Sequence, residues 1–534
     1  MTWFRAGRFL RFLAGAAILA SAGCDFPDTS GDGSGGGGGG VGGGSGGSGG
    51  TTVSGRVTYD FVPAVYSPST QVGRLDFANA VEKPVRNGVV RVVEGSNVLA
   101  ATNTDESGNY SLSFNSSGGA LTVQALAKTS NPEIRVEDNT DSNLLWAVTG
   151  AAPSGNGTLN LHARHGWTGT SYDAAKRIAA PFAILDSMYT ASKAFMAVRS
   201  VQFPPLKVNW SPDNVPQSGD LAQGFINTSH FSSSDGEIYV LGKAGADSDE
   251  FDTHVIVHEW GHYFEANLSR SDSPGGRHGP GDVLDPRIAF GEAWGNALAS
   301  MVLPETVYTD TVWSGGSLTA FGFDAETEPT PTDDPTPNGF SESSVLRLLF
   351  DLYDPANESF DQVSLGLGPI YDVMVGPEKD TDAVTTLASF VAGLKQQSGV
   401  NVTAVDSLLA RYGVGPVTTG FGDGDTDLRG IFTTAALPYS GTIGLGGGYL
   451  PNTWQQNQYY VFQGNGATIT VTATSSQDVA LAVYQRGAQL GKADANTSGT
   501  ETVTFSSQSG ARYVAVLTGF GTTSGDYNVA VTVQ

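Results

Sequence analysis

Cysteine is almost absent from this chain of 534 residues, which contains a single one, Cys24. A disulfide within the chain is therefore impossible, and a zinc site built from several cysteines is excluded as well. Positive charge is also scarce, because 28 Lys and Arg stand against 53 Asp and Glu, which gives a net charge of −25. This balance argues against nucleic acid as a partner.

The first residues resemble an export signal. Three arginines precede a short apolar segment, residues 12–20, which is too short for an ordinary transmembrane helix. Small residues and then Cys24 follow, and this end resembles a bacterial lipobox. The resemblance implies that residues 1–23 are a signal peptide and that Cys24 is lipidated. It also implies export to the bacterial cell envelope, with the protein anchored to a membrane or released extracellularly. The alternative is a plain cleaved signal, in which Cys24 has no role.

Glycine is the residue in excess, at 71 positions. Many of them lie in residues 24–50, a Gly/Ser-rich stretch that starts at the anchor cysteine and is expected to be a flexible linker. Beyond the linker no run is long and apolar enough to span a membrane. Apolar residues make up 39% of the chain, enough for several cores, and the length predicts three or four domains.

Two parts of the chain are predicted to be all-β sandwiches. Residues 51–164 alternate apolar and polar side chains between regularly spaced turns, and they resemble the carboxypeptidase regulatory-like domain. Residues 437–534 show the same period of two and resemble the bacterial pre-peptidase C-terminal domain. We expect the first to be a spacer or binding domain, because it contains no visible catalytic constellation.

The middle part, residues 165–436, begins with strands and continues with helices, which predicts an α+β domain. The expected fold class is therefore multidomain, with an α+β domain between two all-β sandwiches. Periodicity predicts strands over residues 206–210 and 237–241. It predicts helices over residues 181–198, 253–267, 291–302, 344–352, 382–397 and 402–412.

The chemistry is expected at the motif His258-Glu259-Trp260-Gly261-His262. Two histidines four residues apart lie on one face of a helix, with their Cβ atoms about 5–6 Å apart, so both imidazoles can reach one Zn²⁺ ion. Glu259 is rotated by about 100° around the helix. It can reach a water at the metal and take its proton, which is the role of a general base.

A catalytic zinc ion needs a third protein ligand, and Glu292 is the best candidate. It is expected to open a helix that is otherwise small and apolar, where a bare carboxylate would be costly to bury and a metal ion would offset that cost. Asn296, one turn further, could hold His258 or His262 by a hydrogen bond.

These residues resemble those of the gluzincin metallopeptidases, the thermolysin-like class. The resemblance implies a zincin-like fold, zinc bound by His258, His262 and Glu292, and hydrolysis of peptide bonds with Glu259 as the base. The family often has Asp where Asn296 stands. Thermolysin stabilises the oxyanion with a downstream His, but the last His here is His278.

Another group must therefore stabilise the oxyanion in this chain. Tyr353, Arg347 and Tyr371 are candidates, although each is more often structural than catalytic.

The strand over residues 237–241, with Ile238, Tyr239 and Val240, could be an edge strand that pairs with an extended substrate. An interior strand is the alternative.

A second metal is suggested by the acidic run 423–427. Its oxygens suit Ca²⁺, but the run lacks the glycine and the final glutamate of an EF-hand.

The sequence thus predicts an exported, lipid-anchored zinc metallopeptidase. Its substrates would be extracellular or periplasmic proteins or peptides. The alternative is a surface adhesion or binding protein with a degenerate metallopeptidase-like core.

Overall fold

The computed structural model describes residues 50–534, except 71, 280, 315–316, 330, 332–333, 356–358, 423–429, 447–451, 496 and 522–525. The predicted signal peptide, the lipidation at Cys24 and the acidic run 423–427 lie outside the described residues. Within the described ones, no helix has the length and apolar character needed to cross a membrane.

The part after the linker is a β-sandwich whose two sheets enclose Val53, Val57, Val90 and Val92. One sheet contains β1 (Thr51–Phe61), β4 (Val81–Pro84), β7 (Asn109–Phe114), β12 (Gly157–Thr158) and β13 (Leu161–Ala163). The facing strands are β5 (Gly88–Glu94), β6 (Asn97–Asn103), β8 (Leu121–Thr129) and β11 (Ala147–Ala151). A short hairpin of β2 (Ala64–Ser67) and β3 (Val72–Leu75) extends from it.

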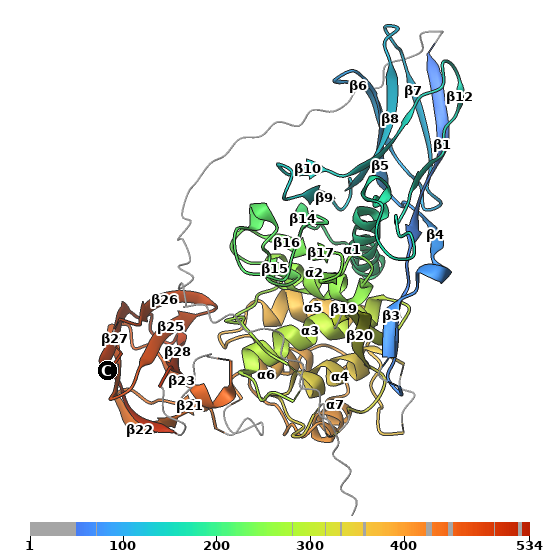
Figure 1. The fold of residues 1–534 in the computed structure, drawn as a ribbon. Coiled ribbons are helices and arrows are strands. Elements are labelled where there is room, and N and C mark those ends of the chain that lie inside the picture. The colour runs from blue at the N-terminus through green and yellow to red at the C-terminus, as the bar shows by residue number, and fades with distance from the viewer. Residues whose placement is uncertain are drawn as a thin grey trace, which may run out of the picture. The chain divides into compact units, whose positions relative to one another are not determined.

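The second of these sheets continues past the predicted boundary at residues 164–165 (Figure 1). Its further strands are β9 (Ile134–Asp138) with β10 (Leu144–Leu145), then β14 (Leu206–Trp210), β16 (Glu237–Val240) and β15 (His230–Ser232). β9 and β16 flank β14 in parallel, and β15 runs antiparallel to β16. β16 is therefore an interior strand, and the expectation of a substrate-binding edge at Ile238, Tyr239 and Val240 is wrong. The outer strand of this series is β15.

Seven α-helices are described in the middle part of the chain. They are α1 (Ala179–Val198), α2 (Thr253–Asn267), α3 (Pro286–Val302), α4 (Glu342–Tyr353), α5 (Leu367–Val373), α6 (Leu387–Leu394) and α7 (Val402–Arg411). α2 has the predicted bounds. α3 begins five residues earlier than predicted, because Pro286 suits the first helical turn and the Asp285 carboxylate accepts the Arg287 N–H. α6 is shorter than predicted, because Thr386 and Ser389 form a capping box at its start.

α2 is the central helix of the middle part. It packs against α1 and strands β15 and β16, and also against α3 and β19 (Val307–Ser314) (Figure 1). Periodicity missed β19 and its hairpin partner β20 (Ser317–Asp324). Phe195 of α1 stacks on Phe264 of α2 with ring centroids 4.7 Å apart, and it also stacks on Trp260. Aromatic packing on one face therefore fixes the rotation of α2, which sets where its histidines point.

The last part of the chain is a second β-sandwich with its own core. One sheet has the order β21 (Phe432–Thr434), β23 (Asn457–Gln463), β28 (Arg512–Gly519), β25 (Val479–Gln485), β26 (Ala488–Ala493). The other has the order β22 (Tyr439–Leu445), β29 (Tyr527–Val533), β24 (Thr468–Ser475), β27 (Gly499–Ser506).

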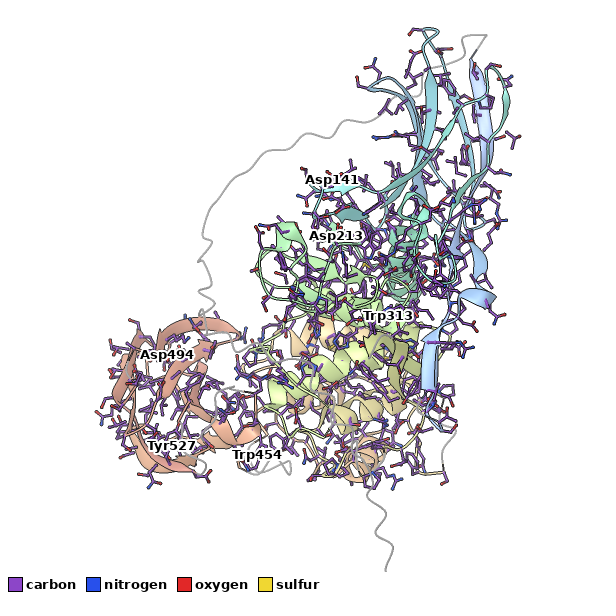
Figure 2. All side chains as sticks on the ribbon, in the orientation of Figure 1. Asp141, Asp213, Trp313, Trp454, Asp494 and Tyr527 are labelled. Carbon is purple, nitrogen blue, oxygen red and sulfur yellow. The ribbon has the colours of Figure 1, made fainter. Side chains whose placement is uncertain are left out.

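This sandwich contacts the helical part. Trp454, labelled in Figure 2, packs on Phe340 at 5.6 Å, and the Tyr459 hydroxyl donates to Asp285 at 2.6 Å. The described part of the chain is mostly β, with several sheets and some helices, which is the organisation of a multidomain protein.

Glu378 is a buried carboxyl group that makes the stability of this fold depend on pH. It accepts a hydrogen bond from Ser389, and its other oxygen has no partner, so burial raises its pKa to about 8. Between the ordinary pKa of 4.5 and this value the native state binds more protons than the unfolded chain, so stability falls as pH rises.

We expect Glu378→Gln to remove this dependence. The free energy of unfolding should rise by an amount on the order of 3 kcal/mol at pH 7 and change little at pH 4. Urea unfolding across this pH range measures it, with Glu305→Gln on the surface as the control. Equal effects at both pH values would contradict the assignment.

Candidate metal centre

Two neighbouring helices bring the predicted ligands together. The Nε2 atoms of His258 and His262 lie 3.0 Å apart, and Glu292 Oε2 on α3 lies 3.3 and 3.4 Å from them. Three ligands about 2.0–2.1 Å from a tetrahedral zinc ion lie about 3.3 Å from one another. The donor set of two imidazoles and one carboxylate therefore fits Zn²⁺ in both chemistry and spacing.

The close approach of α2 and α3 depends on two glycines. A Cβ atom on Gly261 would lie 3.1 Å from the Gly295 Cα, and one on Gly295 would lie 2.7 Å from His258 Nδ1. Side chains at these positions would push the helices apart or displace the imidazole. Glu292 lies in the second turn of α3, and not at its start as predicted, because α3 begins at Pro286.

Hydrogen bonds orient both histidines. His258 Nδ1 donates to Asn296 Oδ1 at 2.8 Å, which is the contact expected for Asn296, and the Asn296 amide donates to Glu342 Oε1 at 2.6 Å. His262 Nδ1 lies 3.1 Å from Glu265 Oε2. Because Nδ1 of each ring is engaged behind the centre, Nε2 of each ring faces the other ligands.

Charge in the centre is compensated internally. Burial alone would raise the pKa of Glu292, but the charge of His262 and hydrogen bonds from both imidazoles hold it well below its ordinary value. Burial alone would lower the pKa of His262, but Glu292 and Glu265 raise it well above its ordinary value. Glu292 and the His262 imidazole therefore stabilise each other's charged forms in the folded chain.

Glu259 lies beside the outer strand of the sheet. Its Oε2 accepts the Phe231 N–H of β15 at 2.7 Å, and the side chain is almost fully buried. The amide of Phe231 therefore points to the α2 side and fixes one carboxylate oxygen. This places β15, and not the predicted β16, next to the motif.

His278 is a site residue that the sequence reasoning did not select. It lies in the loop between α2 and α3, and its Nε2 is 3.4 Å from Glu292 Oε2 and 3.9 Å from Glu342 Oε2. Burial alone would lower its pKa, but these two carboxylates raise it. Tyr308 of β19 also lies close, with its ring 6.5 Å from that of His258. Neither residue has a periodic relation to the motif, so only its histidine or tyrosine identity could have suggested it.

The three proposed oxyanion stabilisers make their contacts elsewhere. Arg347 donates to the Thr327 carbonyl and to Ser343. Tyr353 packs on Phe350, and Tyr371 packs against the rings of both Phe195 and Phe264. These contacts do not bring the three residues to the metal centre.

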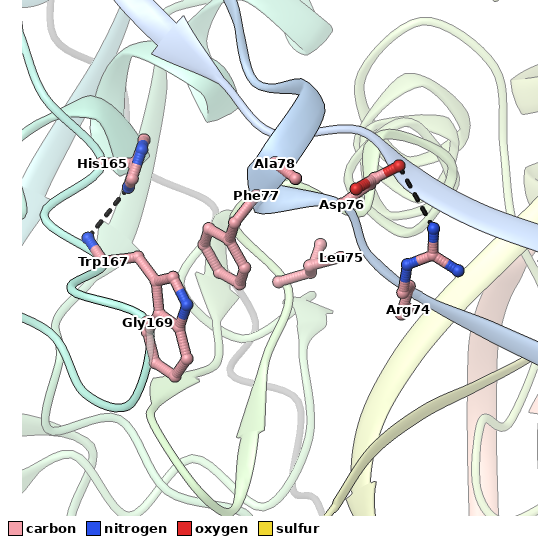
Figure 3. A pocket seen from close by; sticks show the side chains of 8 residues that line it. All are labelled: Arg74, Leu75, Asp76, Phe77, Ala78, His165, Trp167 and Gly169. Atoms are coloured by element: carbon pink, nitrogen blue, oxygen red, sulfur yellow. Dashed lines mark hydrogen bonds and ion pairs between the residues drawn. The ribbon is translucent and has the colours of Figure 1, made fainter.

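A separate surface hollow of about 460 Å³ lies in the N-terminal part (Figure 3). Residues 74–78 line it together with His165, Trp167 and Gly169, and Phe77 stacks on Trp167 with ring centroids 4.8 Å apart. No residue of the metal centre lines this hollow, so it is not the expected substrate cleft.

Comparisons with known proteins give only partial similarity. No protein-family model matches the sequence, and no curated protein matches it. Among solved structures, the pre-peptidase C-terminal domain of a collagenase from Bacillus anthracis is similar at 13% identity, over 19% of this chain and 94% of that one, with a TM-score of 0.16. The surface-associated copper-binding protein CorA of Methylomicrobium album BG8 has 10% identity over 19% of this chain and 98% of that one, with a TM-score of 0.15. A 9R-lipoxygenase from Cyanothece has 10% identity over 28% and 24%, with a TM-score of 0.13.

Two glycines of α3 provide a matched test of the centre. We expect Gly295→Ala to weaken zinc binding by about 10-fold or more, because the new methyl group displaces the His258 ring. Gly291→Ala should leave zinc binding unchanged, since its Cβ would lie no closer than 3.6 Å to any neighbour. Competition against a chromophoric chelator measures both affinities. Equal affinities in the two variants would show that the His258 position does not depend on this contact.

Proposed function

We propose that this protein is a zinc-dependent metallopeptidase of the gluzincin type. The single observation that carries the proposal is the triangle of His258 Nε2, His262 Nε2 and Glu292 Oε2, with edges of 3.0, 3.3 and 3.4 Å. Its spacing and donor set suit a zinc ion with a fourth position open to water or substrate. Glu259, next to His258 in sequence, supplies the base that hydrolysis requires.

Zinc held by these three residues would act as a Lewis acid on the substrate carbonyl and on water. Glu259 would accept the proton of the attacking water and pass it to the nitrogen of the leaving amine. The Phe231 N–H would hold one carboxylate oxygen of Glu259 and leave the other for this proton transfer. His278 and Tyr308 replace Arg347, Tyr353 and Tyr371 as the side chains to test for stabilisation of the oxyanion.

The extended substrate would lie along β15. Among the described strands only β16 pairs with β15, and the Phe231 amide of β15 is directed to Glu259. An edge strand offers backbone groups to a peptide without requiring a particular sequence. Proteins or peptides with an extended segment are therefore the proposed substrates.

The proposed architecture is a zincin-like catalytic domain between the two β-sandwiches. The described strands β9, β14, β16 and β15 and the helices α1–α3 supply its sheet, its base and its metal ligands. An envelope location with a lipid anchor at Cys24 is proposed from the sequence alone. Substrates would then be extracellular or periplasmic.

The test is digestion of a mixed peptide library by the chain from Thr51 to Gln534, with the cleavage products identified by mass spectrometry. We expect cleavages that disappear in Glu259→Gln, with a rate loss of about 10²-fold or more and one zinc ion per chain retained. Glu305→Gln, on the surface, should cleave as the wild type does. Internal cleavages would indicate an endopeptidase, and trimming from one end would indicate an exopeptidase.

Two results would overturn the proposal. Loss of zinc from Glu259→Gln would contradict the role of Glu259 as a base. A folded, zinc-loaded wild type that cleaves no peptide above the blank would favour the binding protein with a degenerate core.

A further inference from the structure

A second group of acidic side chains lies at the other end of α2. Carboxylate oxygens of Asp247, Asp249 and Asp310 all lie within 4.8 Å of one another. They come from β18 (Asp247–Ser248), from the segment that leads into α2, and from β19. Asp252, the residue before α2, is joined to the same place, because its Oδ2 accepts both the N–H and the hydroxyl of Thr311 at 2.8 Å.

Two of these carboxylates each have a buried oxygen without a partner. Asp249 is 4% exposed and Asp252 is fully buried, and Oδ1 of each has no hydrogen-bond partner. The other oxygen of Asp249 accepts the Ser229 hydroxyl at 2.5 Å. Asp249 contributes one carboxylate oxygen to the cluster with Asp247 and Asp310, so its side chain is directed into the cluster.

The negative charge of the cluster has no basic neighbour among the groups that most strongly affect the pKa values of the described carboxylates. The charges that raise the pKa of Asp249, Asp252 and Asp310, in addition to burial, are all other aspartates. Lys243 and Arg177 of this region are engaged elsewhere, with Asp213 at 2.8 Å and Glu250 at 2.5 Å. Buried like charges with unpaired oxygens are costly unless a cation or protons neutralise them.

We propose that Asp247, Asp249 and Asp310 bind a divalent cation, with Asp252 beside them, and that the cation is Ca²⁺. All three ligands offer oxygen, which is what a hard cation requires. Two oxygens that bind one calcium ion at about 2.3–2.6 Å can lie at most about 5 Å apart, a limit that the three clustered carboxylates meet. This site is distinct from the acidic run 423–427.

The site has a structural consequence for the metal centre. A cation there would join β18, β19 and the start of α2, the helix that carries His258 and Glu259. Ser229, bonded to Asp249, directly precedes β15, whose Phe231 amide holds Glu259. The cation would thus fix the outer strand and the motif helix relative to each other, whatever reaction the centre performs.

The test uses the chain from Thr51 to Gln534. A chelator first removes calcium, and one equivalent of zinc is then added back. Ca²⁺ is titrated from about 1 µM to about 10 mM, the range of protein calcium sites, with calorimetry for binding and thermal unfolding for stability. We expect a calcium ion to bind at this cluster and the Tm to rise by a few degrees. Mg²⁺ at the same concentrations controls for ionic strength and should have a smaller effect.

Asp310→Asn and Asp249→Asn should abolish the calcium-dependent rise. Without calcium both variants should be at least as stable as the wild type, because each removes like-charge repulsion, so loss of folding does not obscure the result. Asp213→Asn, on the surface nearby, and Asp425→Asn, in the other acidic run, should keep the response.

Three outcomes would overturn the proposal. The first is a calcium response that survives Asp310→Asn and is lost in Asp425→Asn. The second is an equal response to Ca²⁺ and Mg²⁺ in the wild type and in both cluster variants. The third is a wild type that acid stabilises and calcium does not, which would mean that shared protons neutralise the cluster. Calcium binding and thermal unfolding are both measured without peptide cleavage, so the result for the cation site does not depend on the proposed peptidase function.

Discussion

The contact between α2 and α3 is the constraint on which the rest of the centre depends. Gly261 and Gly295 allow the two helices to approach so closely that no methyl group fits between them. At that separation Glu292 reaches both imidazoles, and its buried charge is compensated by theirs. A buried carboxylate without such partners would destabilise the core, so helix packing and electrostatics require each other here.

Each element packed around α2 fixes the position of one part of the metal centre. Aromatic rings of α1 set its rotation, and β15 directs a backbone amide to Glu259. Asn296 and Glu265 hold the far nitrogens of the two histidines. The centre is therefore held from all sides by ordinary packing and hydrogen bonds.

Local spacing predicted the parts of this site that lie within one helix. The i, i+4 relation placed His258 and His262 on one face, and the small apolar sequence around Glu292 marked it as a buried carboxylate. Relations across long separations were not predictable. Because β15 pairs with β16, the outer strand of the sheet is β15 and not the predicted β16. The loop that carries His278 has no periodic pattern. The acidic cluster exists because β18 and β19 pair, although Asp247 and Asp310 are far apart in sequence.

The metal centre and the aspartate cluster both contain buried carboxylates, but their neighbours shift the pKa values of these carboxylates in opposite directions. At the metal centre, imidazoles face Glu292, and its pKa is lowered although it is buried. At the start of α2, carboxylates face one another, and burial and like charge together raise the pKa values of Asp249, Asp252 and Asp310. The first group can stay ionised in the folded chain through its own bases, so metal binding there competes with protons. The second has no bases among the charges that dominate it, and its neutrality has to come from outside the chain. In a chain that carries a net charge of −25, the cluster beside the motif helix therefore draws its neutrality either from protons or from the proposed cation, and only the cation would also join β18 and β19 to the segment before that helix.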